Sequence, residues 1–186
     1  MEILLLENIT NIYHRTIKIV LMATISLALF QVSNASAQSK KEKSNYQLQA
    51  ELVYNFMDHV TWLEQNIEVK NLCVMDDNPV IPYLNFLTKN NKNIAVIRKY
   101  ENDYLEDCNV LFINEFYQGY TNRLLFKVRT KSILTFSNAK DFAKNGGIVQ
   151  FTLRNSRVEF TLNIKEMRSS QLRISNNIIS ISDVID

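Results

Sequence analysis

The sequence predicts a single α/β domain with a mostly parallel sheet, flanked by helices on both faces and extended by a C-terminal antiparallel hairpin. Four short apolar runs alternate with helical stretches, which is typical of parallel strands joined by right-handed crossovers. These runs are apolar throughout, as expected of strands buried on both faces. After Gly146 and Gly147 the pattern changes to strict alternation, which indicates a hairpin with one wet face.

The N-terminus has the order of an export signal. Arg15 and Lys18 precede the apolar run Ile19–Phe30, and the small residues Ala35–Ala37 then form a cleavage site. The run is shorter than the ~20 apolar residues that span a bilayer, which favours cleavage over an uncleaved membrane anchor. We therefore expect an exported product that starts at Gln38 and does not insert directly into the membrane.

The predicted organisation is a signal peptide over residues 1–37, a polar linker over 38–45 and one α/β domain over 46–186. A domain of this size buries most of its apolar surface. The formal net charge of +2 argues against a nucleic-acid surface, which needs a clustered basic face. The basic run Lys40–Lys43 falls in the linker and is interpreted as a solvated tail.

The elements of the domain follow from apolar spacing. A helix is predicted over Tyr46–Trp62, where apolar residues recur at three- and four-residue spacings without Gly or Pro. Strands are expected at Leu72–Met75, Ile94–Ile97, Val110–Ile113 and Ile133–Phe136, and helices between and after them at Ile81–Lys89, Phe116–Val128 and Asn138–Lys144. The connection Lys99–Asp107 has room for one helical turn.

The C-terminal part begins with the hairpin. Its arms are predicted at Val149–Leu153 and Val158–Ile164, with a turn at Arg154–Ser156. Lys165–Gln171 is predicted to form a helical turn. Leu172–Val184 fits either a strand or a short helix.

Several short motifs occur in the order found in one protein family. They are Tyr54–Phe56 with Val60 and Trp62, Leu72–Val74 with Asp76, Asp77 and Pro79, Cys108–Ile113, Ile133–Ser137, Phe142–Ile148, Arg157–Phe160 and Leu172–Ser175. In this order, over residues 46–181, they resemble the YfiR-like family of exported bacterial proteins. The chain departs from the family pattern at Leu63, where a Pro usually follows the Trp, and at Asn176–Ser180.

The resemblance implies a regulatory role and no enzymatic activity. Members of the family act in the periplasm, where they bind the external sensing domain of an inner-membrane diguanylate cyclase and hold the enzyme inactive. They also form homodimers and carry disulfides. No cofactor is expected, because the sequence has no phosphate-binding Gly loop and no Walker or Rossmann motif.

Two cysteines, Cys73 and Cys108, each open a predicted strand. An even number of cysteines in an oxidising compartment suggests a disulfide, and two free buried thiols are the alternative. If the two strands are neighbours, the side chains can face each other, and the family resemblance favours a bridge. No metal site is expected, because a zinc site would need two further ligands and His59 is the only His after the leader.

A ligand cleft is predicted where the parallel strands end. Asp76 and Asp77 follow the first strand, Asn114 follows the third, and Ser137 follows the fourth. Open α/β sheets bind ligands at this edge, so a small-molecule sensor or carrier is the alternative function. For the two aspartates we favour a simpler interpretation, a turn and a helix N-cap.

No catalytic residues are predicted. His59 has no nucleophile and no orienting partner in the sequence pattern, and Ser137 and Ser175 lack the context of a nucleophilic serine. An exported enzyme without a recognisable catalytic pair is the third possibility, which turnover of a substrate would support.

Four residues are predicted to form a partner or dimer surface. Tyr54 and Trp62 are eight residues apart on the first predicted helix and would share a second apolar face, although such residues more often belong to the core. Arg168 and Arg173 lie near the C-terminus, either as a solvated face or as a contact for an acidic partner.

Overall fold

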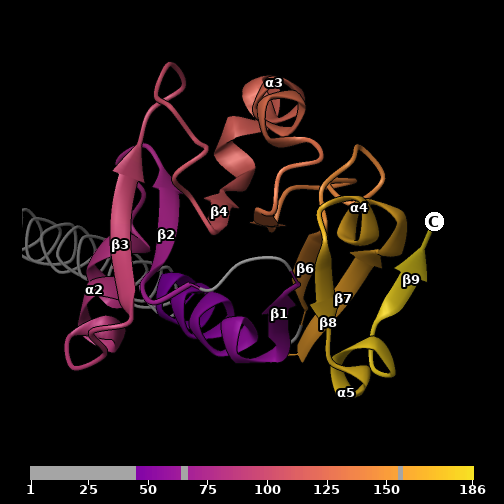
Figure 1. Cartoon of the computed structure of the whole chain (residues 1–186), viewed down its shortest axis with the longest axis horizontal. Helices are drawn as coiled ribbons and strands as arrows, with labels where there is room; N and C mark the ends of the chain where they lie inside the picture. The colour runs from indigo at the N-terminus through magenta and orange to yellow at the C-terminus, as the bar shows by residue number, and fades with distance from the viewer. Residues whose placement is uncertain (1–44, 64–66, 155–156) are drawn as a thin grey trace, which may run out of the picture. The chain divides into compact units, whose positions relative to one another are not determined.

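The computed structural model describes residues 45–63, 67–154 and 157–186. The predicted leader, the linker up to residue 44 and the tip of the predicted hairpin turn (155–156) lie outside the described residues. The unit formed by Tyr46–Asp186 is an α/β domain (Figure 1). None of the described helices is both long and apolar enough to cross a membrane.

The domain centres on a seven-stranded sheet with the order β3-β2-β4-β5-β6-β7-β9. Its strands are β2 (Lys70–Met75), β3 (Ile94–Lys99), β4 (Val110–Ile113), β5 (Leu134–Ser137), β6 (Val149–Arg154), β7 (Arg157–Asn163) and β9 (Asp183–Ile185). From β3 to β6 all neighbours are parallel, β6 and β7 are antiparallel, and β7 and β9 are parallel. The predicted fold class, a mostly parallel sheet with an antiparallel hairpin, is therefore confirmed.

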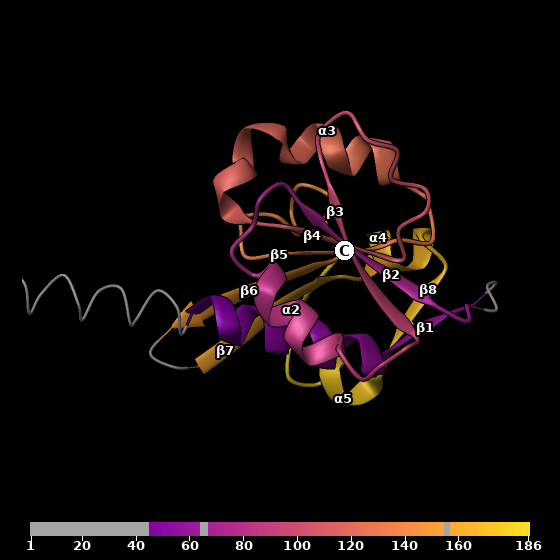
Figure 2. The same cartoon turned by 90° about the vertical axis from the view of Figure 1, so that its left-hand side faces the viewer.

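Helices cover both faces of this sheet (Figure 2). The helical residues 45–56 and α2 (Ile81–Thr88) lie on one face, and η2 (Glu115–Tyr117) with α3 (Gln118–Val128) lies on the other. Alternate residues of each buried strand serve the two sides, as the period of a strand requires. In β2, for example, Leu72 and Val74 join one core cluster while Cys73 and Met75 join the other.

The prediction of a helix over Tyr46–Trp62 is wrong for the C-terminal part of this segment. Helical backbone stops at residue 56, η1 (Met57–His59) follows, and β1 (Val60–Trp62) is a strand. Its partner is β8 (Leu172–Ile174), which pairs antiparallel with it to form a separate two-stranded sheet. The apolar spacing continued through this segment, but pairing with a distant strand overrides the local helical preference.

The predicted helix at Asn138–Lys144 is also wrong, because this segment forms consecutive turns. Asp141 has a φ of 57°, a left-handed conformation that an α-helix cannot contain. Gly146 has a φ of 97°, and a Cβ on Gly147 would lie 2.1 Å from the Phe142 ring. The two glycines thus permit a tight return to β6.

The C-terminal region combines the two forms that the sequence left open. The predicted helical turn is α4 (Ile164–Ser169). Its N-cap is Asn163, whose side chain accepts a hydrogen bond from the Glu166 backbone N–H. The ambiguous segment contains β8, the short helix α5 (Asn176–Ile179) and the start of β9. The connection Lys99–Asp107 contains turns and no helix.

Candidate functional site

Cys73 and Cys108 form a disulfide with a Cα–Cα distance of 5.7 Å. The pairing follows from the sheet order, because Cys73 lies in β2 and Cys108 comes just before the neighbouring strand β4. Both residues are buried, with 0% and 2% of their surface exposed. The predicted bridge is thus present, inside the core between the sheet and α3.

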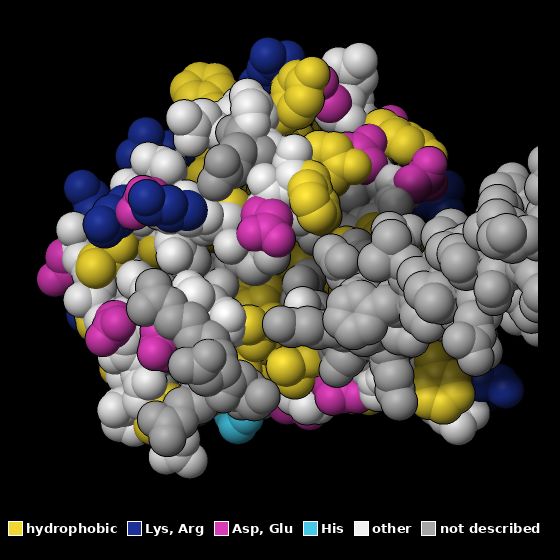
Figure 3. Space-filling model, turned by 180° about the vertical axis from the view of Figure 1, so that it is seen from behind, with side chains coloured by type: hydrophobic (Ala, Val, Ile, Leu, Met, Phe, Trp, Pro, Cys, Tyr) yellow, Lys and Arg dark blue, Asp and Glu magenta, His cyan; other side chains and the backbone are white. Residues whose placement is uncertain are grey.

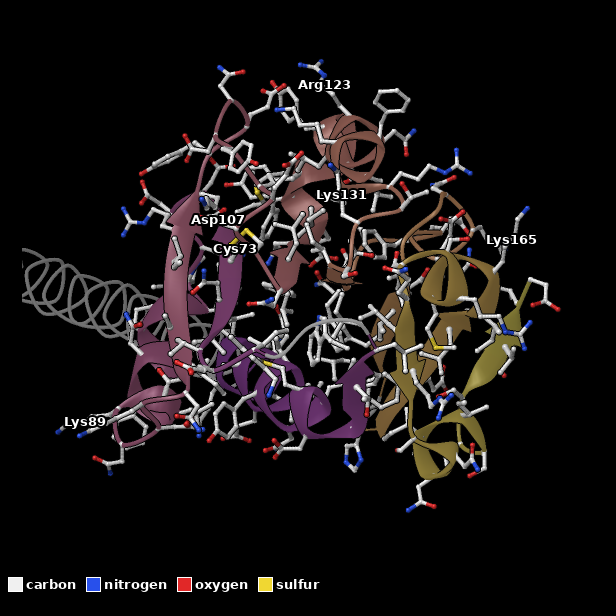
Figure 4. The ribbon with its side chains drawn as sticks, in the orientation of Figure 1. Cys73, Lys89, Asp107, Arg123, Lys131 and Lys165 are labelled. Carbon is white, nitrogen blue, oxygen red and sulfur yellow. A yellow bond between two sulfur atoms is a disulfide. The ribbon has the colours of Figure 1, made fainter. Side chains whose placement is uncertain are left out.

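A charged pair lies beside the disulfide (Figure 4). The Lys99 Nζ is 2.7 and 2.8 Å from the two carboxylate oxygens of Asp107, and it also donates to the backbone carbonyl of Tyr104. Cys73, Asp107 and Cys108 are the one group of potential metal ligands close together in the described part of the chain. Because the disulfide uses both sulfur atoms, this group does not offer thiolate ligands for a metal.

The four predicted cleft residues all lie at the carboxyl ends of neighbouring strands, but their side chains make different interactions. Ser137 is fully buried and its Oγ accepts from the Ala139 N–H, while the Asn114 Oδ1 accepts from the Phe116 N–H. These two side chains therefore stabilise their own loops. Asp77 forms an ion pair of 2.6 Å with Arg98 at the surface.

Asp76 has a φ of 55° and ends β2 in a tight turn. The turn that we favoured at this point is present, although no side-chain hydrogen bond caps α2 at its N-cap, Val80. Instead the Asn78 Oδ1 accepts a hydrogen bond from the Val80 N–H at 2.9 Å. Asp76 is left facing a cavity.

This cavity has a volume of about 410 Å³. Three acidic and three tyrosine side chains line it, and Met75 and Leu124 complete the lining. The acidic residues are Asp76, Asp77 and Glu101, and the tyrosines are Tyr100, Tyr117 and Tyr120. Burial raises the pKa of Tyr117, and the neighbouring Asp76 carboxylate raises it further by its charge and by a hydrogen bond with the tyrosine hydroxyl. Asn114 and Ser137 do not line it.

The sequence interpretation missed the tyrosines of this cavity. Tyr117 ends η2 and Tyr120 lies three residues later in the first turn of α3, a spacing typical of one helix face. Tyr100 follows β3. A local signal existed for Tyr117 and Tyr120, but only the sheet order brings β2, β3 and α3 to one place.

The predicted shared surface of Tyr54 and Trp62 is not present. Trp62 lies in β1 beyond the end of the helix, is 7% exposed, and donates from Nε1 to the Ser132 carbonyl at 3.1 Å. Tyr54 is partly buried against the core, and its hydroxyl accepts a hydrogen bond from Asn91. Both aromatic rings thus pack mainly inside the domain, which agrees with the core alternative.

Arg168 and Arg173 are exposed, on α4 and on β8. Lys165, on the same helix as Arg168, is exposed as well and points away from the body of the domain (Figure 4). No ion pair in the described part of the chain involves any of the three. We call these three residues the basic strip.

A second cavity, of about 370 Å³, adjoins the basic strip. Lys165, Arg129 and Lys144 contribute positive charge to its lining, and Phe126 contributes a ring that is 79% exposed. Glu166 lies in its wall and pairs with Arg129 at 3.4 Å. The region between α3 and α4 therefore offers an exposed apolar ring beside several cations.

Comparison with known proteins identifies a family by sequence and a similar fold among solved structures. The model of the YfiR/HmsC-like family matches residues 46–183. A search of curated proteins finds no match. A solved structure with a similar fold is a conserved domain protein from Vibrio cholerae O1 biovar El Tor, at a TM-score of 0.57 and 10% identity. The alignment covers 76% of this chain and 60% of that protein, and at this identity it shows the fold alone.

Proposed function

Because the chain belongs to the YfiR/HmsC-like family, we propose that it is a periplasmic regulatory protein that inhibits a membrane-bound diguanylate cyclase. It would bind the external sensing domain of that enzyme and act stoichiometrically, without catalysis of its own. Inhibition by binding requires a higher affinity for the inactive form of the cyclase than for the active form, because only differential affinity shifts a conformational equilibrium.

The basic strip supports this proposal as the contact surface. Its cations Lys165, Arg168 and Arg173 are exposed and are not neutralised by ion pairs within the described residues. Unpaired surface cations accelerate the encounter with an acidic partner and select against basic ones. The adjoining cavity, with the exposed Phe126, supplies an apolar anchor of the kind that carries binding energy at interfaces.

Charge reversal of the basic strip tests the surface. The double variant Arg168→Glu/Arg173→Glu should bind the purified external domain of the cyclase at least tenfold more weakly than the unchanged protein, and the difference should shrink at high salt. Lys89→Glu/Lys92→Glu is the matched control, since both lysines are exposed and take part in no ion pair among the described residues.

Equal binding by the two double variants would assign the contact to another surface. The inhibitory role itself is tested with the cyclase in membrane vesicles. Cyclic-di-GMP synthesis should fall as the unchanged protein is added, and should reach its minimum near equimolar amounts. Undiminished synthesis at saturating protein would contradict the proposed function.

The proposed location and assembly have their own measurements. Cell fractionation followed by N-terminal sequencing should find the protein in the periplasm beginning at Gln38. Sedimentation of the purified domain should give the mass of a homodimer. A cytoplasmic protein that keeps its leader would exclude direct contact with an external sensing domain.

A further inference from the structure

The tyrosine-lined cavity lies at the point where the sheet changes its direction of winding. The chain goes from β2 to β3 on one side, and then returns to β4 on the other side of β2. Open α/β sheets bind ligands in the crevice outside the carboxyl ends of the two strands that flank such a reversal. Here that crevice lies between the loop after β2, which holds Asp76, and the segment after β4, which holds Tyr117.

One carboxylate of this cavity is without a cationic partner. Asp77 pairs with Arg98, and Glu101 pairs with Arg123. Asp76 belongs to no ion pair among the described residues, and its carboxylate interacts with the Tyr117 hydroxyl. A negative charge in a partly enclosed site favours occupation by a cation.

The aromatic part of the lining suits the same kind of ligand. Tyr100 and Tyr120 each have 45% of their surface exposed, so their rings remain accessible. The Arg123 guanidinium already lies 5.5 Å from the centre of the Tyr120 ring, a geometry in which the ring attracts positive charge. Figure 3 shows hydrophobic and acidic side chains gathered in the upper part of the molecule, where Figure 1 draws α3 and the loop after β3.

We propose that this cavity binds a small organic ammonium compound. The positively charged nitrogen pairs with the Asp76 carboxylate and lies against the rings of Tyr100, Tyr117 and Tyr120. Aromatic rings arranged around a carboxylate attract alkylated ammonium groups in particular, because these have weak hydration and large apolar surfaces. The inference concerns a ligand site and does not depend on the proposed inhibition of a cyclase.

The test uses choline and ethanolamine as probes, with sodium acetate as the anionic control, in calorimetric titrations of the full domain. Asp76→Asn removes the charge and keeps the backbone, because Asn tolerates the left-handed conformation that Asp76 adopts. Asp141→Asn is the matched control. Asp141 also has a left-handed backbone, with a φ of 57°, and its carboxylate pairs with Lys144 away from this cavity.

Choline should bind the unchanged protein and the Asp141→Asn variant with equal affinity, and should bind Asp76→Asn at least tenfold more weakly. Tyr117→Phe, which keeps the ring, should retain more affinity than Tyr117→Leu. Saturable binding of neither amine, or equal affinity for both aspartate variants, would overturn the proposal. Stronger binding of acetate than of choline would do the same. Each of these results leaves the cyclase experiments unaffected.

Discussion

The two faces of the seven-stranded sheet are stabilised in different ways. The face covered by residues 45–56, α2 and α4 holds a large apolar cluster with several aromatic rings. Phe56 and Phe136 have ring centres 5.2 Å apart, and Phe136 and Phe151 have centres 5.1 Å apart. On the opposite face, under α3, the apolar cluster is smaller and contains the disulfide.

The difference is already visible in single strands. In β5, Leu134 and Phe136 enter the aromatic cluster, whereas Thr135 and Ser137 alternate to the other side. Both hydroxyls accept backbone N–H groups, from Ile148 and from Ala139. The α3 face thus replaces part of its apolar contact with a covalent link and local hydrogen bonds, and the tyrosine-lined cavity opens on this side. Substitutions on the two faces should therefore change the free energy of unfolding by different amounts.

The largest effect is expected on the aromatic face. Phe136→Ala should lower the free energy of unfolding by about 3–5 kcal/mol, because it removes a fully buried ring and leaves a cavity. Chemical denaturation followed by circular dichroism measures the change. Phe86→Ala, at a ring that is 77% exposed on α2, is the control and should change stability by less than about 0.5 kcal/mol. Similar losses for both variants would contradict the assigned core.

On the α3 face the disulfide should dominate. The double variant Cys73→Ala/Cys108→Ala should lose about 2–4 kcal/mol, since the bridge closes a loop with a sequence separation of 35. Because both sulfur atoms are buried, we expect reductant to act only after partial unfolding. Melting curves with and without reductant check this point. An unchanged melting temperature in the double variant would show that the α3 face does not depend on the bridge.

A smaller loss is expected from the polar side of β5. Thr135→Val keeps the shape of the side chain but leaves the buried Ile148 N–H without its acceptor, which should cost about 1–3 kcal/mol. Thr61→Val on the exposed side of β1 is the matched control. Equal stabilities of the two variants would mean that water replaces the lost acceptor.

The smallest effect concerns charge at the surface of the α3 face. Lys131, 2.7 Å from Glu106, lowers the pKa of that carboxyl from its ordinary value of 4.5, and a hydrogen bond from Tyr104 adds to the shift. Since the pKa is lower in the folded state, the pair stabilises the protein above the unfolded pKa. The contribution is lost as the pH falls through the folded value.

In Glu106→Gln the free energy of unfolding should therefore fall slightly less steeply as the pH is lowered, as measured by denaturation at a series of pH values. Glu68→Gln is the control, at an exposed carboxyl that joins no ion pair of the described residues. An acid limb that is equally steep in both variants would exclude a role for the Glu106 pair.

Sequence reasoning succeeded where local pattern and tertiary environment agree. The run Val110–Ile113 is strand β4 without any change of boundary, because a strand buried on both faces leaves a continuous apolar run. The hairpin arms could be predicted for a related reason. Apolar and polar residues alternate along each arm, because one face of the hairpin is buried and the other is exposed to water. The disulfide needed the additional inference that β2 and β4 are neighbours.

It failed where a distant segment decides the local conformation. Val60–Trp62 continues a helical apolar pattern but becomes a strand because β8 is available to pair with it, more than a hundred positions further along the chain. Asn138–Lys144 was expected to be helical, and no local pattern announced the left-handed Asp141. Trp62 was therefore placed on a surface that the folded chain does not present.

The sequence by itself determined the fold class and the positions of the central strands, because both depend on which residues avoid water. Tertiary structure alone decided how the helices end and what surrounds Asp76. The order of the strands in space, β3-β2-β4, brings Tyr100 and Tyr117 to that carboxylate. Hydrophobic patterning records that a residue is buried, but the contacts that it makes depend on strands and helices that are remote in the chain.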